Sequence, residues 1–216
     1  MQKKSVFTLA CLTFYLTSCS TIYYSTWEKL GKEKRDLLKD RVTATRSEQQ
    51  ETKKEFQDAL TTLRVTYTAV HTPLATKYDS LKSRYDDCES QSGDLKSRIE
   101  SMDQIAKDLF KEWRSEANSI ANSGLKYDSL AKLKSTQEKY EHMHEALNDS
   151  YANLQPVLTQ FRDHVLYLKH NLNAQALGSL KDEAKSIESG IENLIHQMQT
   201  SIAETDQFLK EFQAHG

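Results

Sequence analysis

Residues 130–172 read LAKLKSTQEKYEHMHEALNDSYANLQPVLTQFRDHVLYLKHNL, and this stretch decides the fold. Stepping alternately three and four residues along it meets apolar side chains almost every time. The positions are Leu130, Leu133, Gln137, Tyr140, His144, Leu147, Tyr151, Leu154, Leu158, Phe161, Val165, Leu168 and Leu172. A repeat of about 3.5 residues is typical of a helix that packs along one narrow seam. The pattern therefore predicts a long helix with one buried face.

The same spacing occurs on both sides of this stretch. It runs through Tyr78, Leu81, Tyr85, Cys88, Ser92, Leu95, Ile99, Met102, Ala106, Leu109 and Trp113, and again through Leu177, Leu180, Ala184, Ile187, Ile191, Leu194 and Met198. The first part of the chain is less regular, because residues 43–55 (TATRSEQQETKKE) contain no large apolar side chain. We expect residues 43–55 to be exposed or frayed.

Local signals separate the helical stretches. Thr72-Pro73 predicts a helix start with Pro at the first helical position, and Asn122-Ser123-Gly124 predicts a helix end with a left-handed Gly. Pro156 is expected to kink its helix without ending it, since the repeat continues through it.

The predicted fold is all-α, an elongated antiparallel four-helix bundle resembling a coiled coil. One domain, residues 19–216, holds helices at about 22–70, 74–122, 126–172 and 177–213, after a signal peptide at 1–18.

Composition supports long solvated helices. The chain has 6 Gly and 2 Pro in 216 residues, too few for an all-β fold, which needs a turn signal every ~8–12 residues. With 38% hydrophobic and 28% charged residues, a thick enzyme core is not expected. A formal net charge of −2 without a basic block argues against nucleic acid as a partner.

The N-terminus has the features of an export signal. A basic start precedes a short apolar run at residues 6–16, which is too short to span a bilayer. Leu16-Thr17-Ser18-Cys19 resembles a bacterial lipobox, which implies cleavage before Cys19 and attachment of fatty acyl chains such as palmitate to it. Ser20 implies sorting to the outer membrane of a Gram-negative bacterium, on the periplasmic side. The alternative is a plain secretory signal in which Cys19 is incidental.

Three stretches resemble one known family. Residues 23–42 (YYSTWEKLGKEKRDLLKDRV), 109–113 (LFKEW) and 161–180 (FRDHVLYLKHNLNAQALGSL) resemble the uncharacterised bacterial lipoproteins of the domain of unknown function 2959. The resemblance implies an exported helical protein with no established activity. It supplies no catalytic residues.

Chemical motifs are sparse. The spacing of Glu141 and His144 matches one half of a di-metal carboxylate site, but a second Glu-x-x-His pair is missing. We therefore expect no metal and no cofactor other than the lipid at Cys19, and we interpret His144 as a polar residue that sets register. Cys88 falls on a seam, so we interpret it as a core residue rather than a reactive thiol.

Two surfaces are candidates for binding. Because residues 43–55 offer nothing to bury, the seams opposite them are expected to lie exposed at Ile99, Met102, Leu147 and Tyr151 and to contact a second copy or an envelope partner. A second, weaker candidate is the cluster Arg162, His164, Lys169, His170 and Asn171, which could dock a protein or cell-wall polymer. The alternative is that this cluster caps a helix end.

The sequence thus favours a structural or interaction protein of the cell envelope. A ligand- or metal-binding bundle is the alternative, and no enzyme motif is present.

Overall fold

The computed structural model describes residues 34–69, 71–171 and 173–214. Within them it contains helices and no strand, which confirms the all-α prediction. The helices are α2 (Lys34–Thr68), α3 (Leu74–Ser119), α4 (Ser123–Ala152), α5 (Leu154–His170), α6 (Ala174–Ser179) and α7 (Lys181–Ala214). None of the helices in these segments is long and apolar enough to cross a membrane. The predicted signal peptide and Cys19 lie outside the described residues.

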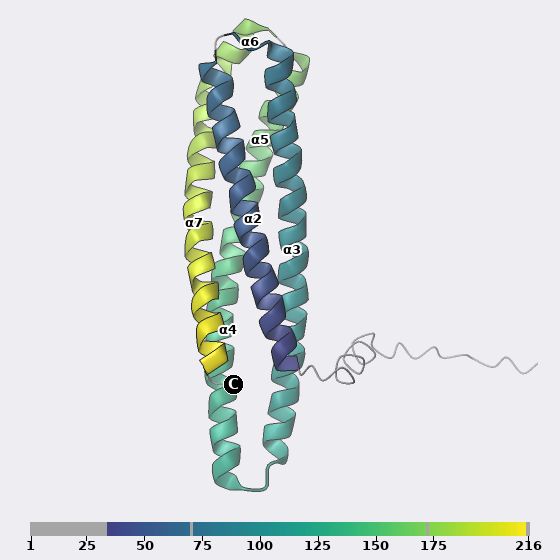
Figure 1. Ribbon diagram of the computed structural model, residues 1–216, viewed down its shortest axis with the longest axis vertical. Coiled ribbons are helices and arrows are strands. Elements are labelled where there is room, and N and C mark those ends of the chain that lie inside the picture. Colours follow the sequence, from purple (N-terminus) through teal and green to yellow (C-terminus); the bar gives the residue numbers. More distant parts are fainter. Residues whose placement is uncertain (1–33, 70, 172, 215–216) are drawn as a thin grey trace, which may run out of the picture.

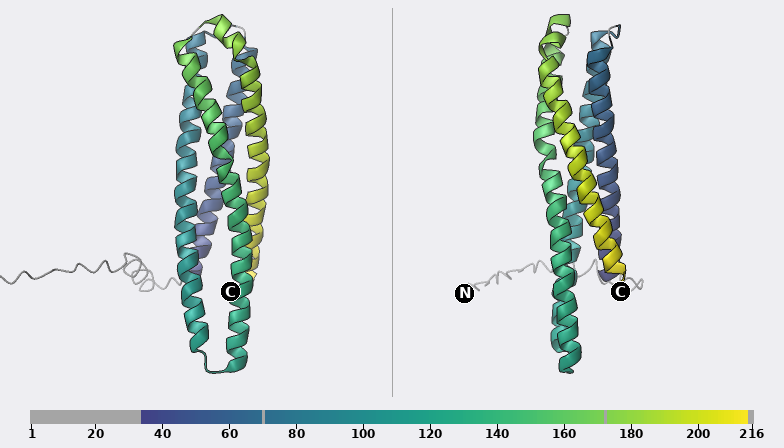
Figure 2. Two further views of the ribbon diagram at one scale, coloured as in Figure 1. Left: turned by 180° about the vertical axis from the view of Figure 1, so that it is seen from behind. Right: turned by 90° about the vertical axis from the view of Figure 1, so that its left-hand side faces the viewer.

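The helices form four long rods (Figure 1). One rod each comes from α2, α3 and α7, and the fourth consists of α4 and α5 placed end to end. Neighbouring rods run antiparallel, and the short α6 crosses the end between α5 and α7 (Figure 2). This is the predicted elongated four-helix bundle. The predicted start of the first helix, at about residue 22, falls outside the described residues.

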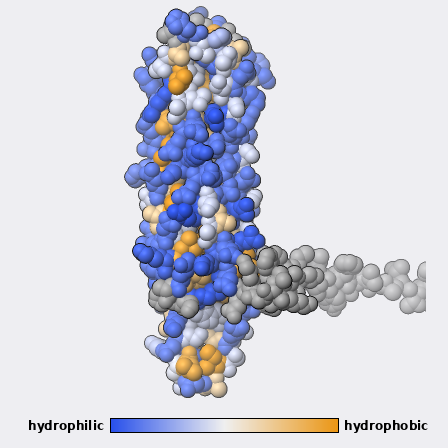
Figure 3. Space-filling model, in the orientation of Figure 1, coloured by the Kyte–Doolittle hydropathy of each residue, from blue (hydrophilic) through white to orange (hydrophobic). Residues whose placement is uncertain are grey.

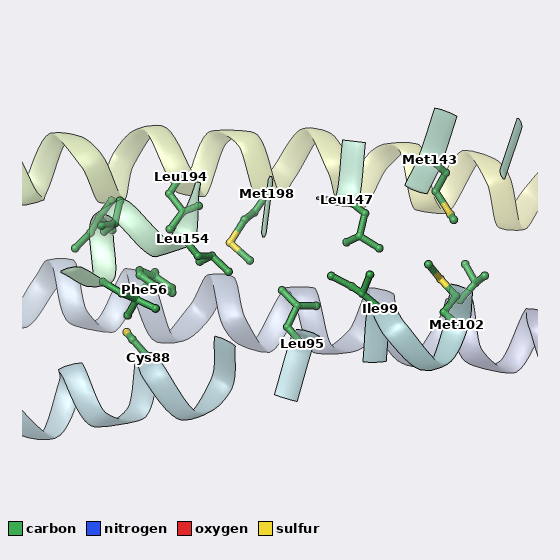
Figure 4. Close-up of a cluster of buried hydrophobic side chains, with 14 of the residues drawn as sticks. Phe56, Cys88, Leu95, Ile99, Met102, Met143, Leu147, Leu154, Leu194 and Met198 are labelled. Carbon is green, nitrogen blue, oxygen red and sulfur yellow. The ribbon is translucent and has the colours of Figure 1, made fainter. Parts of the chain in front are cut away.

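The predicted seams are the core. Every described seam position of the stretch from Leu130 to Leu168 is buried or half-buried, and Leu154 and Phe161 have no exposed surface. The core continues along the other rods, where Cys88 packs near Phe56 (Figure 4). The 3.5-residue spacing therefore identified the buried face of three rods, those formed by α3, by α4 with α5, and by α7.

The fourth rod bends between α4 and α5, close to Pro156 (Figure 2), but the helix is divided there, whereas Pro156 is expected from the sequence to kink it without ending it. Asn153 separates α4 from α5 but keeps helical backbone angles, and its side-chain Nδ2 donates to the carbonyl of Asp149 at 2.8 Å. Pro156 has no N–H to offer the carbonyl of Ala152, so the regular bonding pattern is interrupted at this point. The seam passes through the bend without a shift, since Leu154 is fully buried.

Several predicted helix boundaries differ from the structure: α3 ends at Ser119 instead of about residue 122, and the helix predicted at about 177–213 is divided into α6 and α7. Pro73 is the residue before α3 rather than its first helical residue. Asn122 begins α4 instead of ending α3, because its side chain accepts a hydrogen bond from the backbone N–H of Leu125 at 3.0 Å. Gly124 lies in the first turn of α4 and does not adopt the predicted left-handed conformation. An Asn side chain satisfies a free N–H at a helix start, which explains the difference.

The expectation that residues 43–55 are exposed or frayed is wrong. They are helical within α2, and Thr45, Gln49 and Thr52 are almost completely buried. Each of these two threonine hydroxyls donates to the carbonyl four residues earlier, at 2.9 and 2.8 Å. Because the hydroxyls are satisfied within the helix, the threonine methyl groups can face the core at little cost.

The other rods present matching small polar side chains. We call this set the polar layer; it comprises Thr45, Gln49, Thr52, Ser92, Ser150, Ser201 and Thr205, all buried. The amide nitrogen of Gln49 donates to the hydroxyl of Ser201 and so joins α2 to α7. The amide oxygen of Gln49 is buried without a partner in the described residues.

The proposed mid-rod interaction surface is therefore wrong. Ile99, Met102 and Leu147 have at most 6% of their surface exposed, and Tyr151 is half-buried. Ile99 and Leu147 point toward each other in the bundle interior (Figure 4). The polar layer completes the core at this level, so these seams are covered by the chain itself.

A pair of substitutions tests the seam. Leu158→Asp places a charge at a position that is 6% exposed, next to the bend, and we expect a loss of about 3 kcal/mol or more in unfolding free energy. Lys54→Asp on the exposed side of α2 should change it by less than about 0.5 kcal/mol. Urea unfolding measures both. Losses of similar size in the two variants would contradict the seam assignment.

Candidate functional site

The outward side of α5 combines basic and apolar side chains. The inward side of this helix is buried through Leu154, Val157, Leu158, Phe161, His164, Val165 and Leu168. The opposite side carries Arg162, Asp163, Leu166, Tyr167, Lys169 and His170, which we call the α5 outer face. Spacings of three, four and seven residues place them in two adjacent rows along the helix. The described chain leaves this face uncovered.

Two large apolar residues are unusual on this face. Leu166 is 48% exposed and Tyr167 is 45% exposed, in a rod whose surface is otherwise mostly polar. Sequence reasoning missed both. They lie between the seam positions Val165 and Leu168 and so fall outside the 3.5-residue repeat. Apolar residues outside the repeat were the signal that could have identified an exposed apolar surface.

The predicted docking cluster is divided by the structure. Arg162, Lys169 and His170 lie on the α5 outer face, where Arg162 forms an exposed ion pair with Asp163 at 3.0 Å. Exposed pairs of this kind contribute little stability, so Arg162 remains available to a competing carboxylate. Lys169 and His170 occupy the last turn of α5, where positive charge interacts favourably with the helix dipole.

Asn171 has a capping role. Its side-chain Nδ2 donates to the carbonyl of Tyr167 at 3.0 Å, and its backbone N–H donates to the carbonyl of Leu168 at 3.1 Å. Both bonds satisfy carbonyls that a helix end leaves without a partner. For this residue the capping interpretation of the cluster is confirmed.

His164 does not belong to the surface. It is 2% exposed, and its Nε2 lies 2.7 Å from the hydroxyl of Tyr67, which links α5 to α2. Burial lowers the pKa of His164 from 6.5 to about 4 and raises the pKa of Tyr67. The imidazole is therefore neutral near pH 7, and its Nδ1 is buried without a partner in the described residues. We interpret the pair as a polar contact within the core.

The weak metal candidates do not form a binding group. Glu141 is exposed on α4, whereas His144 is half-buried and stacks on Tyr140 with ring centroids 5.5 Å apart. The closest acidic side chain recorded for His144 is that of Asp103, with 3.8 Å between Nε2 and Oδ1. No group of three or more His, Cys, Asp or Glu residues suited to a metal occurs among the described residues.

Cys88 lies in the core, as its seam position predicts. Burial raises the pKa of the Cys88 thiol well above its usual range, which keeps the sulfur protonated. A protonated, inaccessible thiol is a poor nucleophile.

Comparisons with known proteins identify a family and nothing else. A family model described as "Protein of unknown function (DUF2959)" matches residues 23–212. No curated protein and no solved structure matches the chain.

The buried histidine makes stability depend on pH. The unfolded chain binds a proton at His164 near pH 6.5, whereas the folded chain resists protonation until about pH 4, so stability falls as pH drops through this window. Between pH 7.5 and 5.0 the protonation of His164 lowers the free energy of unfolding by about 2 kcal/mol. The double variant His164→Phe/Tyr67→Phe removes both partners together. Its free energy of unfolding should fall by about 2 kcal/mol less than that of the wild type between pH 7.5 and 5.0.

Urea unfolding at the two pH values measures the difference. Tyr67→Phe alone is the control, and it should keep the wild-type pH dependence because burial, not the Tyr67 bond, lowers the pKa of His164. Equal pH dependence in the wild type and the double variant would show that His164 is not the responsible group.

Proposed function

The chain belongs to the DUF2959 family of proteins of unknown function, and we propose that it is a lipid-anchored envelope protein that binds a partner protein through the α5 outer face. The proposed anchor is acylated Cys19, in the outer membrane of a Gram-negative bacterium and on its periplasmic side. Its support is the lipobox-like sequence Leu16-Thr17-Ser18-Cys19 after a basic and apolar start. At least two acyl chains are needed to hold a protein stably in a bilayer, and a bacterial lipoprotein anchor meets this need.

The observation that carries the proposal is the position of the α5 outer face along the rod. The chain enters α2 in the lower half of Figure 1, above the end formed by α3 and α4, whereas α5 lies in the upper half. The 46 residues of α3 alone correspond to a length of about 70 Å. A chain tethered by Cys19 would therefore present the α5 outer face well away from the membrane surface.

The chemistry of this face favours an acidic protein surface. Tyr167 and Leu166 provide apolar area, and the same face carries the basic side chains Arg162, Lys169 and His170 against the one carboxylate of Asp163. Tyrosine and arginine are enriched in protein interfaces, and basic side chains steer acidic partners toward them. The binding would fix the position of the partner relative to the membrane.

We propose a binding role rather than an enzymatic one, with the lipid at Cys19 as the only attached group. Among the described residues, the groups whose pKa is most strongly shifted are Tyr67, Cys88, Tyr140 and His164. In each case the main cause is burial inside the bundle. Cys88, Tyr140 and His164 are buried and Tyr67 is half-buried beside His164, so we assign these side chains to packing.

The anchor is tested by removing the acceptor thiol. Cys19→Ser should abolish labelling with a fatty-acid probe in cells and leave an unprocessed or soluble periplasmic form. Membrane fractionation measures the second effect. Wild-type protein that takes up no fatty-acid probe would refute the lipobox interpretation.

The partner is tested by photocrosslinking in living cells. A benzophenone side chain at Tyr167 should give an adduct with another protein, and Arg162→Glu/Lys169→Glu should abolish that adduct. The exposed position Lys54 on α2 is the control and should give none.

Other products would change the proposal. An adduct of twice the mass of the chain would replace the partner by a second copy, and an adduct with cell-wall polymer would replace it by a polysaccharide. The same adducts from Lys54 as from Tyr167 would remove the α5 outer face as the binding surface.

A further inference from the structure

Two of the rods project beyond the other two at the lower end of the bundle (Figures 1 and 2). The four-rod part ends near Arg35, whose guanidinium donates to the carbonyl of Phe212 at 2.8 Å and lies 4.5 Å from the centroid of the Phe212 ring. Lys34, the first described residue of α2, pairs with Glu112 of α3 at 2.5 Å. Past this level α3 and α4 continue as a helical hairpin. We call residues 113–129 the hairpin tip, because Trp113 donates to the hydroxyl of Ser129 at this level.

The hairpin tip exposes the most accessible large apolar side chains of the described chain. Tyr127 is 74% exposed and Leu125 is 61% exposed. Figure 3 shows a hydrophobic patch at this end of the molecule. The seam pattern did not identify these two residues, because both precede the first seam position of their helix.

The backbone around this patch is held in place. Asn122 accepts from the backbone N–H of Leu125, and the ammonium of Lys126 donates to the carbonyl of Asn118 at 3.0 Å, across the turn between α3 and α4. The apolar side chains are therefore displayed by an ordered turn, and their exposure is a built feature of the fold. Exposed apolar surface of this kind usually marks a contact.

The charges of the hairpin tip balance. It holds two basic side chains, Arg114 and Lys126, and two acidic side chains, Glu116 and Asp128. An end of the rod with no net charge and with exposed Leu and Tyr is suited to the headgroup layer of a bilayer, where aromatic rings reside at the interface.

The tether is attached at this same end. Glu112, the partner of Lys34, precedes the last residue of α3 by seven positions, so the hairpin tip extends about 10 Å beyond the start of α2. Residues 20–33 separate Cys19 from α2, and 14 residues span about 21 Å even in their most compact regular form, a helix. A tether of this length lets the hairpin tip reach the bilayer.

We propose that the hairpin tip contacts the surface of the membrane, with Leu125 and Tyr127 in the interfacial layer of the phospholipid headgroups. This proposal rests on the proposed lipid anchor at Cys19. The acyl chains supply the affinity, and the tip supplies the orientation, because two contacts at one end hold the long rod upright. The α5 outer face then stands at the far end, directed away from the bilayer.

Depth-dependent fluorescence quenching tests the contact. The mature chain, with a hexahistidine sequence in place of Cys19, is tethered to vesicles of phosphatidylethanolamine and phosphatidylglycerol containing a nickel-chelating lipid. A fluorophore is attached at Ser123→Cys in the hairpin tip or at Lys169→Cys at the far end. Cys88 is buried and stays unlabelled in the folded chain. Lipids that carry a quencher in the interfacial layer should quench the fluorophore at position 123 and leave that at position 169 unchanged.

Matched substitutions identify the side chains responsible. Leu125→Ser/Tyr127→Ser should lose the quenching at position 123 while the tagged protein stays on the vesicles. Leu166→Ser/Tyr167→Ser makes the same changes at the far end of the rod. This variant should keep the quenching at position 123. All four residues are exposed, so circular dichroism should report an unchanged helical fold.

Two results would overturn the proposal. One is vesicle-bound protein without quenching at position 123, and the other is equal quenching at both positions, which indicates a rod lying flat. The tag supplies the tether, so neither result depends on acylation of Cys19. Fatty-acid labelling in cells decides the anchor separately.

Discussion

The narrow seam along each rod is the constraint on which the rest of this structure depends. Each helix carries one row of apolar side chains, and no single rod can bury that row alone. Four rods solve the problem by facing their seams inward wherever all four lie side by side. The core is only a few side chains wide, so side chains from the neighbouring rods must fill it at every level along the bundle. This requirement gives the polar middle of α2 its importance.

Small hydroxyl groups close the middle of the rod. Thr45 and Thr52 satisfy their hydroxyls within α2, and Gln49 reaches Ser201 on α7. The buried amide nitrogen of Gln49 meets Ser201 only in one alignment, so this bond favours one register of α2 against α7. Because the polar layer fills the middle of the core, the exposed large apolar side chains lie toward the ends of the bundle. One end carries Leu125 and Tyr127, and the α5 outer face carries Leu166 and Tyr167 toward the other.

Sequence spacing predicted the buried face of the rods formed by α3, by α4 with α5, and by α7, and Pro156 indicated the bend between α4 and α5, although the helix is interrupted there. It did not predict the burial of Gln49, because the pattern of one helix does not reveal which side chains its neighbours offer at the same level. The same limit explains His164, which looked like a surface residue until Tyr67 of α2 was placed beside it. Leu166 and Tyr167 could be recognised in the sequence as apolar residues that lie outside the repeat. What covers them depends on tertiary structure, which spacing does not describe.

Amide hydrogen exchange of α2 tests the central claim, that residues 43–55 belong to the core, most directly. If the polar layer closes the bundle, the backbone amides of residues 43–55 exchange as slowly as those of residues 56–66, where α2 buries Phe56, Leu60 and Leu63. Exchange of residues 43–55 at the rate of an unstructured peptide, with residues 56–66 still protected, would contradict the claim.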